Sequence, residues 1–400
     1  MVGERLAAPA VLKTYTKHPK FTMKHSKIGI YIHVPFCVSK CAYCDFYSLS
    51  QAGLEGLKDR YVDALCRQFR EAKRSFGDLT ASSVFMGGGT PTALTAEHFS
   101  AIFKELKSCF DLTPDAEITV ESNPATFDAD KLCAMRSLGV NRLSMGVQSA
   151  NDAELKLLGR IHTFKDAEDA FYLARGCGFS NINLDVMYGI PSQTSESFGN
   201  TLTALTALSA EHISVYGLQL EEGTPLYEKR ENYVFPDEDA VCELNRQARL
   251  FLESKGYGRY EISNYSKAGC ECRHNLLYWN QGEYLGFGSG AYSFFDNRRF
   301  SFPENAELFS GADNFFDLTH TDEILTKEDA EREYVMLRLR LCEGLSLHPD
   351  PEKLSDASPY FKKAERYVKA GLMEINDGRL YFTPDGFNVS NAILSELIFD

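Results

Sequence analysis

The chain has 400 residues, 44% of them hydrophobic and 12% aromatic, so it can bury the core of one large domain or of two to three modest ones. Its formal net charge of −14 argues against nucleic acid as the main partner, and no apolar run approaches the length of a membrane-spanning helix. Its 11 cysteines do not form the framework of a small disulfide-rich secreted domain, which favours a reducing cytoplasm.

Residues 1–27 form a basic leader ahead of the first predicted strand. Positions 5–27 contain lysines and one arginine but no acidic residue. A transit peptide has this charge, but such peptides are rich in arginine and serine, and here Arg5 and Ser26 stand alone. We therefore interpret the leader as a disordered segment or an over-annotated start, with Met23 as the natural first residue.

From residue 28 to 256, short β-like runs alternate with amphipathic helical stretches. Strands are predicted at 29–34, 83–86, 117–121, 142–146, 182–187 and 212–220. Helices are predicted at 96–109, 128–138, 163–175, 195–209 and 237–255. The repeated βα pattern predicts a parallel sheet with right-handed crossovers, either a doubly wound sheet or an incomplete barrel.

Directly after the first predicted strand, Cys37, Cys41 and Cys44 form a Cys-x3-Cys-x2-Cys triplet. Soft thiolates this close together predict a site for an iron–sulfur cluster, zinc or copper(I). A structural zinc site would need a fourth ligand, which His33 could supply. Three ligands on a four-iron cube instead leave one iron open. We favour the cube, because a residue within a strand cannot easily fold back to the loop that follows it.

Polar residues expected at the ends of the predicted strands favour the barrel. The triplet follows the first strand, the glycine-rich segment 87–92 follows the second, and Glu121 ends the third. Gln148 follows the fourth strand, Asp185 lies late in the fifth and Gln219 late in the sixth. Because the carboxyl ends of barrel strands meet at one rim, these groups would share one site.

Beyond residue 256 the pattern changes twice. Residues 257–324 are rich in glycine and aromatic residues and are interpreted as a connecting region, and 325–400 as a helix-rich domain. Within that domain, Asp377-Gly378 predicts a two-stranded hairpin, or wing, and 387–399 a closing helix. Winged domains often bind DNA, but the acidic net charge favours a lid or docking domain.

The cysteine triplet and the glycine-rich segment together resemble a known family. Tyr31-Ile-His-Val-Pro-Phe-Cys37 with its two further cysteines, followed by Gly87-Gly-Gly-Thr-Pro-Thr92, is similar to the radical S-adenosylmethionine (SAM) enzymes. More narrowly, it resembles their coproporphyrinogen III oxidase-like branch, from about residue 29 to 291 and more weakly to the end. The resemblance implies a partial (β/α)6 barrel, then a C-terminal α-rich domain with a small β-wing. It also implies a [4Fe–4S] cluster on the three cysteines, whose open iron binds SAM.

The same resemblance implies which residues surround SAM. The glycine-rich segment would lie beside the methionine moiety, where missing side chains let the backbone approach the ligand. Asp185 would accept hydrogen bonds from the ribose, and Arg160 suits bidentate recognition of a carboxylate. Each polar side chain could instead bridge groups within the fold, and each tyrosine could be a core residue. The implied set is Tyr31, Tyr43, Gly88, Gly89, Thr90, Glu121, Gln148, Arg160 and Asp185.

Two further positions separate the branches of this family. The oxidases typically carry a fourth cysteine two residues after the third, where this chain has Phe46. The segment His274-Asn-Leu-Leu-Tyr278-Trp279, together with Cys44-Asp-Phe, resembles the HemW type, chaperones that bind heme and hand it to other proteins. The chain is therefore interpreted as a heme chaperone without coproporphyrinogen oxidase activity. Radical decarboxylation of coproporphyrinogen III to protoporphyrinogen IX is the alternative, and a radical reaction on another substrate is a third.

The HemW resemblance implies heme as a further cofactor and His274 as its axial ligand, since neutral imidazole binds heme iron. His274 and Asn275 could instead orient the SAM site from within the fold, and Cys270 or Cys272 could ligate the heme. The implied partners are heme-acceptor apo-proteins and a low-potential electron donor of the flavodoxin or ferredoxin type, with no nucleic acid. A cytoplasmic protein of this kind would contact membrane hemoproteins only transiently.

Overall fold

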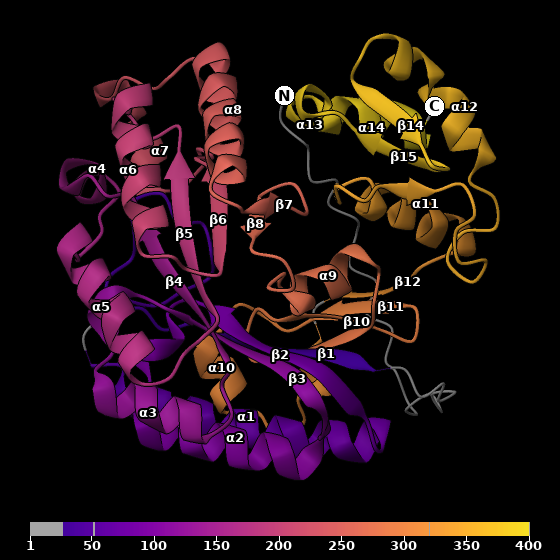
Figure 1. Ribbon diagram of the computed structural model, residues 1–400. Helices are drawn as coiled ribbons and strands as arrows, with labels where there is room; N and C mark the ends of the chain where they lie inside the picture. Colours follow the sequence, from indigo (N-terminus) through magenta and orange to yellow (C-terminus); the bar gives the residue numbers. More distant parts are fainter. Residues whose placement is uncertain (1–26, 51–52, 320, 400) are drawn as a thin grey trace.

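The structure, a computed structural model, describes residues 27–50, 53–319 and 321–399, so the predicted basic leader lies almost wholly outside the described residues. In the described part, a curved sheet of 12 strands carries helices on its convex side, and a second sheet of 3 strands lies near the C-terminus (Figure 1). The large sheet contains β1 (Ile28–Val34), β2 (Thr80–Gly88), β3 (Asp111–Ser122), β4 (Arg142–Gln148), β5 (Ile182–Tyr188), β6 (His212–Gly217), β7 (Gly258–Arg259), β8 (Asn264–Ser266), β9 (Tyr284–Phe287), β10 (Tyr292–Phe295), β11 (Arg298–Ser301) and β12 (Thr321–Ile324). Its helices are α1 (Glu55–Phe76), α2 (Ala96–Cys109), α3 (Ala129–Ser137), α4 (Asp152–Leu157), α5 (Phe164–Gly176), α6 (Ser195–Ala207), α7 (Pro225–Glu228), α8 (Glu238–Ser254), α9 (Arg273–Trp279) and α10 (Ala306–Ser310).

Strands β1 to β6 are the six strands predicted from the sequence, and the prediction of a partial (β/α)6 barrel is confirmed. They pair in parallel and in chain order, so all their carboxyl ends lie at one rim. That rim carries the cysteine loop and the glycine-rich segment. Some boundaries were wrong: β2 and β3 are longer than predicted, and β6 ends at Gly217, so Gln219 follows it as an exposed loop residue.

Successive residues of β1 face opposite sides of the sheet. Ile28, Ile30 and Ile32 are fully buried in the main hydrophobic core. Burying a side chain of this size stabilises the fold by about 1.5–3 kcal/mol. The alternating residues Tyr31 and His33 point to the concave side, where Tyr31 Oη lies 3.1 Å from His33 Nδ1. We call the space on this side the lumen.

The helices predicted after each strand begin at residues suited to cap them. Thr95, Asp128, Thr163, Thr194 and Asp237 each precede a helix, and each side chain accepts a hydrogen bond from a backbone N–H in its first turn. Such a cap contributes about 1 kcal/mol. The caps fix where each crossover turns back toward the sheet.

The segment 257–324 extends the sheet at both edges, which the sequence did not predict. β8 pairs antiparallel with β6, and β9 pairs parallel with β1. The segment that joins these two strands contains α9 and crosses from one edge of the arc to the other. A Cβ built on Gly29 would lie 3.2 Å from the His274 ring, which places α9 at the amino ends of the barrel strands.

The C-terminal residues contain α11 (Lys327–Arg338), α12 (Ser358–Lys369), α13 (Pro384–Asn388), α14 (Ser390–Phe399) and the strands β13 (Leu345–Ser346), β14 (Met373–Asn376) and β15 (Arg379–Phe382). The predicted hairpin is confirmed, since Asp377 and Gly378 take φ angles of 50° and 70° between β14 and β15. The wing is larger than predicted, because β13 pairs with β15. The predicted closing helix is wrong in one respect: the chain breaks at Val389, where Ser390 Oγ donates to the Phe387 carbonyl at 2.8 Å.

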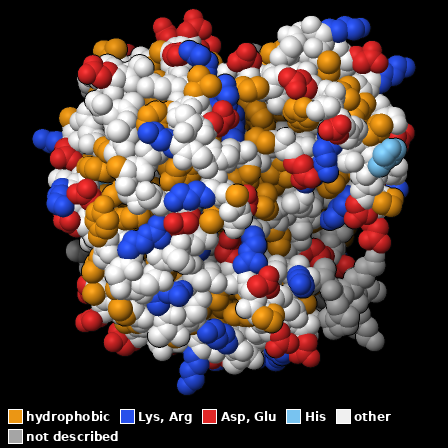
Figure 2. Space-filling model, in the orientation of Figure 1, with side chains coloured by type: hydrophobic (Ala, Val, Ile, Leu, Met, Phe, Trp, Pro, Cys, Tyr) orange, Lys and Arg blue, Asp and Glu red, His pale blue; other side chains and the backbone are white. Residues whose placement is uncertain are grey.

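A furrow separates the C-terminal elements from the barrel helix α8. Hydrophobic side chains gather along it in the space-filling view (Figure 2). Below the furrow, a cavity of about 340 Å³ opens beside α9.

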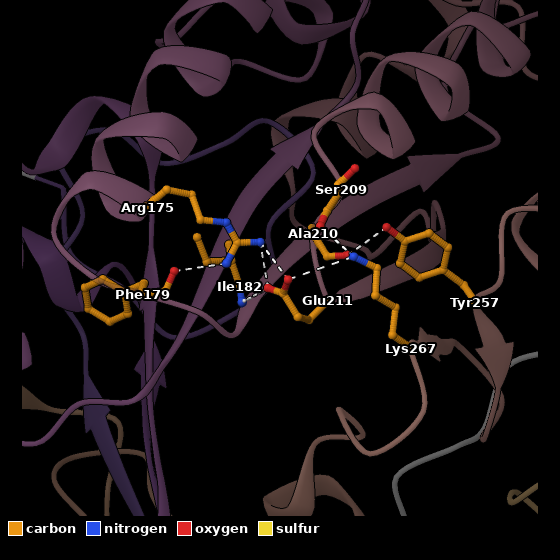
Figure 3. Close-up of polar contacts among 8 residues, drawn as sticks. All are labelled: Arg175, Phe179, Ile182, Ser209, Ala210, Glu211, Tyr257 and Lys267. Carbon is orange, nitrogen blue, oxygen red and sulfur yellow. Dashed lines mark hydrogen bonds and ion pairs between the residues drawn. The ribbon is translucent and has the colours of Figure 1, made fainter.

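At the amino ends of β5 and β6, a polar cluster ties α5 to the sheet (Figure 3). Arg175 Nη2 donates to both carboxylate oxygens of Glu211, at 2.8 and 2.7 Å. The backbone N–H of Ile182 donates to the same carboxylate at 3.1 Å, and Lys267 Nζ donates to the Ser209 carbonyl at 2.7 Å. The cluster therefore joins α5, β5 and the chain that leads to α9, at the barrel end opposite the cysteines.

Candidate cofactor site

The three cysteines lie on the loop that follows β1, and a backbone hydrogen bond joins the two ends of this loop. Cys37 N donates to the Leu49 carbonyl at 2.8 Å. Arg160 Nη1 donates to Cys41 Sγ at 3.3 Å, and Thr90 Oγ1 donates to Cys37 Sγ at 3.5 Å. All three thiols are half-buried and unpaired. Hydrogen-bond donors aimed at sulfur stabilise thiolates, so these residues fit a cluster ligand set.

The zinc alternative with His33 is not formed. His33 Nε2 lies 3.1 Å from the Tyr47 carbonyl oxygen, and Nδ1 is on the Tyr31 hydroxyl. Within residues 27–50, 53–319 and 321–399, no group of three or more His, Cys, Asp or Glu side chains is arranged to hold a single metal ion. A cube places each thiolate on a different iron, so its sulfurs stand farther apart than the ligands of one ion.

The glycine-rich segment packs directly on the start of the cysteine loop. Gly89 and Thr90 donate their backbone N–H groups to carbonyls of Val34 and Phe36 at 2.9 and 2.8 Å. Gly88 has φ of +107°, and a Cβ there would lie only 2.5 Å from the nearest ring atom of His33. The missing side chains therefore allow this backbone approach, which brings Thr90 to the cysteine loop.

Glu121 is a carboxyl group with an incomplete set of partners. Within the described residues it accepts a single hydrogen bond, from Gly88 N at 3.2 Å. Burial, with Asp185 nearby, raises the pKa of Glu121 to about 8. A Cβ on Gly87 would lie 2.7 Å from Glu121 Oε2, so that glycine makes room for the carboxyl group. A bound cation or N–H donor would complete its hydrogen bonding.

Arg160 and Gln148 meet at the end of β4. A Cβ on Gly146 would lie 3.0 Å from Gln148 Nε2 and 3.1 Å from Arg160 Nη2. Gln148 has φ of 72°, in the left-handed region that non-glycine residues rarely adopt. The buried Nε of Arg160 has no hydrogen-bond partner in the described residues. Both side chains thus lie beside the cysteine loop, with donor capacity to spare.

Asp185 lies deeper in the lumen, on β5. Asn183 Nδ2 donates to Asp185 Oδ1 at 2.7 Å. Burial raises the pKa of Asp185, while hydrogen bonds from Asn183 and Ser214 and the charges of Arg142 and Arg160 oppose that rise. Because Asp185 also acts on Glu121 and Arg160, the polar residues of β3, β4 and β5 form one electrostatic site.

The two predicted tyrosines border this site from opposite sides. Tyr43 packs on Leu158 and Met187, and burial raises its pKa although Arg160 opposes the effect. Tyr31 stacks on Phe85 with ring centroids 6.4 Å apart, and burial together with Glu121 raises its pKa. The two rings therefore lie beside the polar site, Tyr31 near Glu121 and Tyr43 near Arg160.

His274 lies apart from this site, at the other end of the lumen. Its Nδ1 lies 2.8 Å from Ser83 Oγ and its Nε2 lies 2.7 Å from Tyr278 Oη. The residue is 1% exposed, and burial followed by the charge of Arg142 lowers its pKa to about 3. Both ring nitrogens thus have partners, which join α9 to β2. Cys272 is buried beside it, with Sγ 3.5 Å from Glu117 Oε1.

Sequence reasoning missed a second row of polar residues in the lumen. Asn183, His212 and Ser214 are each 2% exposed or less and hydrogen-bond one another across β5 and β6. Arg142 is 2% exposed in the same region, and its Nε has no partner within the described residues. Their signal was present, because polar residues alternate with aliphatic ones along the predicted strands.

Comparison with known proteins agrees with this geometry. The profile of the Radical SAM superfamily matches residues 31–205, and that of the HemN C-terminal domain matches residues 325–389. The heme chaperone HemW of Haemophilus influenzae is 36% identical over 327 residues, which cover 80% of this chain and 84% of that protein. Heme chaperone HemW of Bacillus subtilis is 33% identical over 379 residues, covering 92% of this chain and 98% of that protein.

Among solved structures, coproporphyrinogen III oxidase (HemN) from Escherichia coli, a radical SAM enzyme, shares the fold with a TM-score of 0.82. The match covers 93% of this chain and 90% of that one at 24% identity. Every helix in the described residues is too short or too polar to cross a bilayer.

Proposed function

Because this chain belongs to the HemW family of radical SAM proteins, we propose that it is a heme chaperone, which binds heme and transfers it to acceptor hemoproteins. The observation that carries this proposal is the identity with HemW proteins over most of the chain. The relative from Mycobacterium tuberculosis, for example, is 32% identical over 94% of this chain.

The superfamily brings a [4Fe–4S] cluster and SAM as cofactors. A cluster held by the three cysteines would supply the electron for the radical chemistry of this superfamily. We assign Cys37, Cys41 and Cys44 to three irons, with Thr90 and Arg160 donating to two of the sulfurs. These donors offset thiolate charge and orient the ligands.

We assign the surrounding polar residues to SAM. Glu121, which has unfilled acceptor capacity, would bind the ammonium group, and Asp185 would accept hydrogen bonds from the ribose hydroxyls. Gly88, Gly89 and Gln148 would border the ligand from the strand ends, while Tyr31 and Tyr43 would exclude water from it. Each role is proposed from the position of the residue near the carboxyl ends of the strands, beside the cysteine loop.

Two features favour a carrier over the oxidase. Phe46, where an oxidase carries its fourth cysteine, is 70% exposed and thus fills no structural role that would demand a phenylalanine. The motif His274–Trp279 coincides with α9, which plugs the amino end of the lumen. His274 remains our proposed axial ligand, and ligation through Nε2 would require the Tyr278 hydroxyl to move away.

We propose a low-potential electron donor of the flavodoxin or ferredoxin type as a further partner. Val38 and Phe46 on the cysteine loop and Ile161 next to Arg160 are exposed by 59%, 70% and 46%, an apolar surface beside the cluster ligands. A cytoplasmic location is supported by the unpaired state of all 11 cysteines, which suits a reducing compartment.

The oxidase assay tests the proposal most directly. Anaerobically reconstituted protein is incubated with coproporphyrinogen III, SAM and a reductant. We expect no decarboxylation, and protoporphyrinogen formed at a catalytic rate would overturn the chaperone assignment. A second assay mixes hemin-loaded protein with an apo-hemoprotein and follows the Soret band, which we expect to shift to that of the acceptor.

Variants test the assigned residues. Cys41→Ser should lose the cluster absorbance, whereas Cys66→Ser, which changes a thiol buried on α1, should keep it. His274→Ala should weaken the Soret band of the hemin complex. An unchanged spectrum in that variant would place the axial ligand elsewhere.

A further inference from the structure

A continuous chain of hydrogen bonds runs through the lumen from Asp185 to the start of α9. Asn183 Nδ2 is 2.7 Å from Asp185 Oδ1, and Asn183 Oδ1 is 2.6 Å from His212 Nδ1. His212 Nε2 lies 2.8 Å from Tyr260 Oη, which in turn accepts from the Cys272 backbone N–H at 3.2 Å. Cys272 is the residue that immediately precedes α9.

Every bond in this chain has one allowed direction. The Asn183 carbonyl oxygen can only accept, so His212 Nδ1 carries the proton and donates it. Burial, with the charge of Arg142, lowers the pKa of His212 well below its usual value, so the ring is neutral and Nε2 accepts from the Tyr260 hydroxyl. All donors therefore point from α9 toward the Asp185 carboxylate, and aligned bonds of this kind strengthen one another.

Each end of the chain is accessible to a ligand. Asp185 is half-buried in the lumen, where the SAM residues converge. At the other end, Tyr260 lines the cavity of about 340 Å³ beside α9, together with Leu276 and Asn280 of that helix region. The links between these ends, Asn183 and His212, are 2% and 1% exposed. The chain thus joins two accessible places through a closed interior.

A second attachment fixes α9 to the same interior. Glu117 accepts from the backbone N–H groups of Arg273 and His274 at 3.1 and 3.0 Å. Glu117 lies on β3, four residues before Glu121 and therefore on the same face of the strand. The helix that carries the His-Asn-x-x-Tyr-Trp motif is consequently positioned by lumen side chains.

We propose that His212 and Tyr260 are positioning residues that couple SAM binding at Asp185 to the position of α9 and, through it, to heme binding. The heme part of this inference rests on the proposed function, whereas the link between SAM and α9 does not. A ligand that donates hydrogen bonds to Asp185 weakens the hydrogen bond that Asp185 accepts from Asn183. The chain then relaxes bond by bond as far as the Cys272 N–H.

The chain holds its own reporter for the first test. Trp279, the only tryptophan in the sequence, is the last residue of α9. SAM is titrated into anaerobically reconstituted protein while Trp279 emission is recorded, and SAM binding is measured separately by equilibrium dialysis. We expect emission to change with the same midpoint as SAM binding.

Tyr260→Phe removes the hydroxyl at the centre of the chain and keeps the ring. It should bind SAM with nearly unchanged affinity but lose the emission change. Tyr257→Phe is the matched control, because its hydroxyl makes a 2.7 Å bond to the Ala210 carbonyl outside the chain. His212→Phe, which fills the imidazole space without either bond, is the second variant and should behave as Tyr260→Phe does.

The second test measures hemin affinity with and without SAM. Coupling between sites typically changes affinity by a factor of about 5–150, and hemin must change SAM affinity by the same factor. We expect such a factor in the wild type and in Tyr257→Phe, and a ratio near one in Tyr260→Phe.

Three results would overturn the inference. SAM that binds the wild type without changing Trp279 emission shows that α9 does not respond. An emission change retained in Tyr260→Phe and His212→Phe shows that the response takes another route. Loss of SAM binding in Tyr260→Phe makes it part of the SAM site instead. If hemin does not bind at all, the proposed function fails, while the emission test still decides the link between SAM and α9.

Discussion

Glu121→Gln should stabilise the protein and weaken its cofactor site at the same time. In the structure the half-buried carboxyl group lies on β3 and accepts a hydrogen bond from Gly88 N, which a glutamine side-chain oxygen can also accept. Burial and Asp185 raise the pKa of Glu121 to about 8, from an ordinary value of 4.5. The substitution keeps the shape and removes the ionisation.

The size of the effect follows from that pKa. At about 1.4 kcal/mol per pKa unit, the difference corresponds to ~4–5 kcal/mol of disfavoured ionisation. The carboxyl group faces the lumen, where solvent reaches it, so we expect about half of this, ~2–3 kcal/mol.

The sign depends on pH. Between pH 4.5 and 8 the unfolded chain releases the Glu121 proton while the folded chain retains it, so this group lowers the stability of the fold as the pH rises. The Glu121→Gln variant has no ionisable group at this position, so its stability does not fall with pH for this reason. Its advantage in free energy of unfolding should be near zero at pH 5 and should reach its full size near pH 8.

Urea unfolding of the reconstituted protein without SAM, followed by circular dichroism from pH 5 to 8.5, measures this difference. SAM affinity should fall about tenfold or more in the same variant, because a charged partner for the ligand is lost. Glu117→Gln is the control on the same strand, and it should destabilise the protein because Glu117 holds two backbone N–H groups of α9. A constant advantage across the pH range, or a less stable Glu121→Gln at pH 8, would refute the reasoning.

Three further outcomes are expected. Glu211→Gln should lower the free energy of unfolding by about 1–3 kcal/mol, measured by urea titration, because it breaks the paired hydrogen bonds from Arg175. Gly88→Ala should lower the free energy of unfolding by about 2 kcal/mol or more and reduce SAM binding in dialysis. The reason is that φ at this position is +107° and the new methyl group would lie 2.5 Å from a ring atom of His33. Mild oxidation with a diazene reagent should join Cys133 to Cys177, whose sulfurs lie 3.2 Å apart; mass spectrometry should show the loss of two hydrogens, and Cys133→Ser should prevent it.

The strands of the arc were predictable because their sequence signal is local. In β1 and β5, aliphatic residues alternate with polar or aromatic ones, and Pro35 and Gly189 follow directly where the strands end. Helix starts were equally local, since Thr95 and Thr163 cap helices that begin within a residue of the predicted ones. The long helix α1 escaped prediction, although Leu57, Tyr61 and Leu65 mark its buried face, and so did the short helices α4, α7, α9 and α10.

What the sequence could not show depends on contacts between distant segments. β9 has four residues and no long apolar run, and it becomes a strand because β1 offers it an unpaired edge. His274 reads equally well as a ligand or as a structural residue. Its hydrogen-bond partner Ser83 lies 191 positions away in the chain, so no local sequence pattern predicts that contact.

The cysteines, by contrast, could be predicted as a set because their ligand spacing is contained within one loop. Strand-end positions alone placed Glu121, Gln148 and Asp185 at one predicted site, and the family resemblance supplied their proposed roles. Their neighbour His212 was overlooked, because alternation with aliphatic residues marks its face of the strand but does not reveal its partner Asn183 on another strand.

The strap formed by residues 267–283 has a consequence for what the barrel can admit. It leaves the sheet beside β6 through β8 and rejoins it beside β1 through β9, so it bridges the two free edges of an incomplete cylinder. Its fixed contour length limits how far those edges can spread. The strap therefore joins the first and last strands of the arc at the end opposite the cysteine loop, away from the cluster ligands.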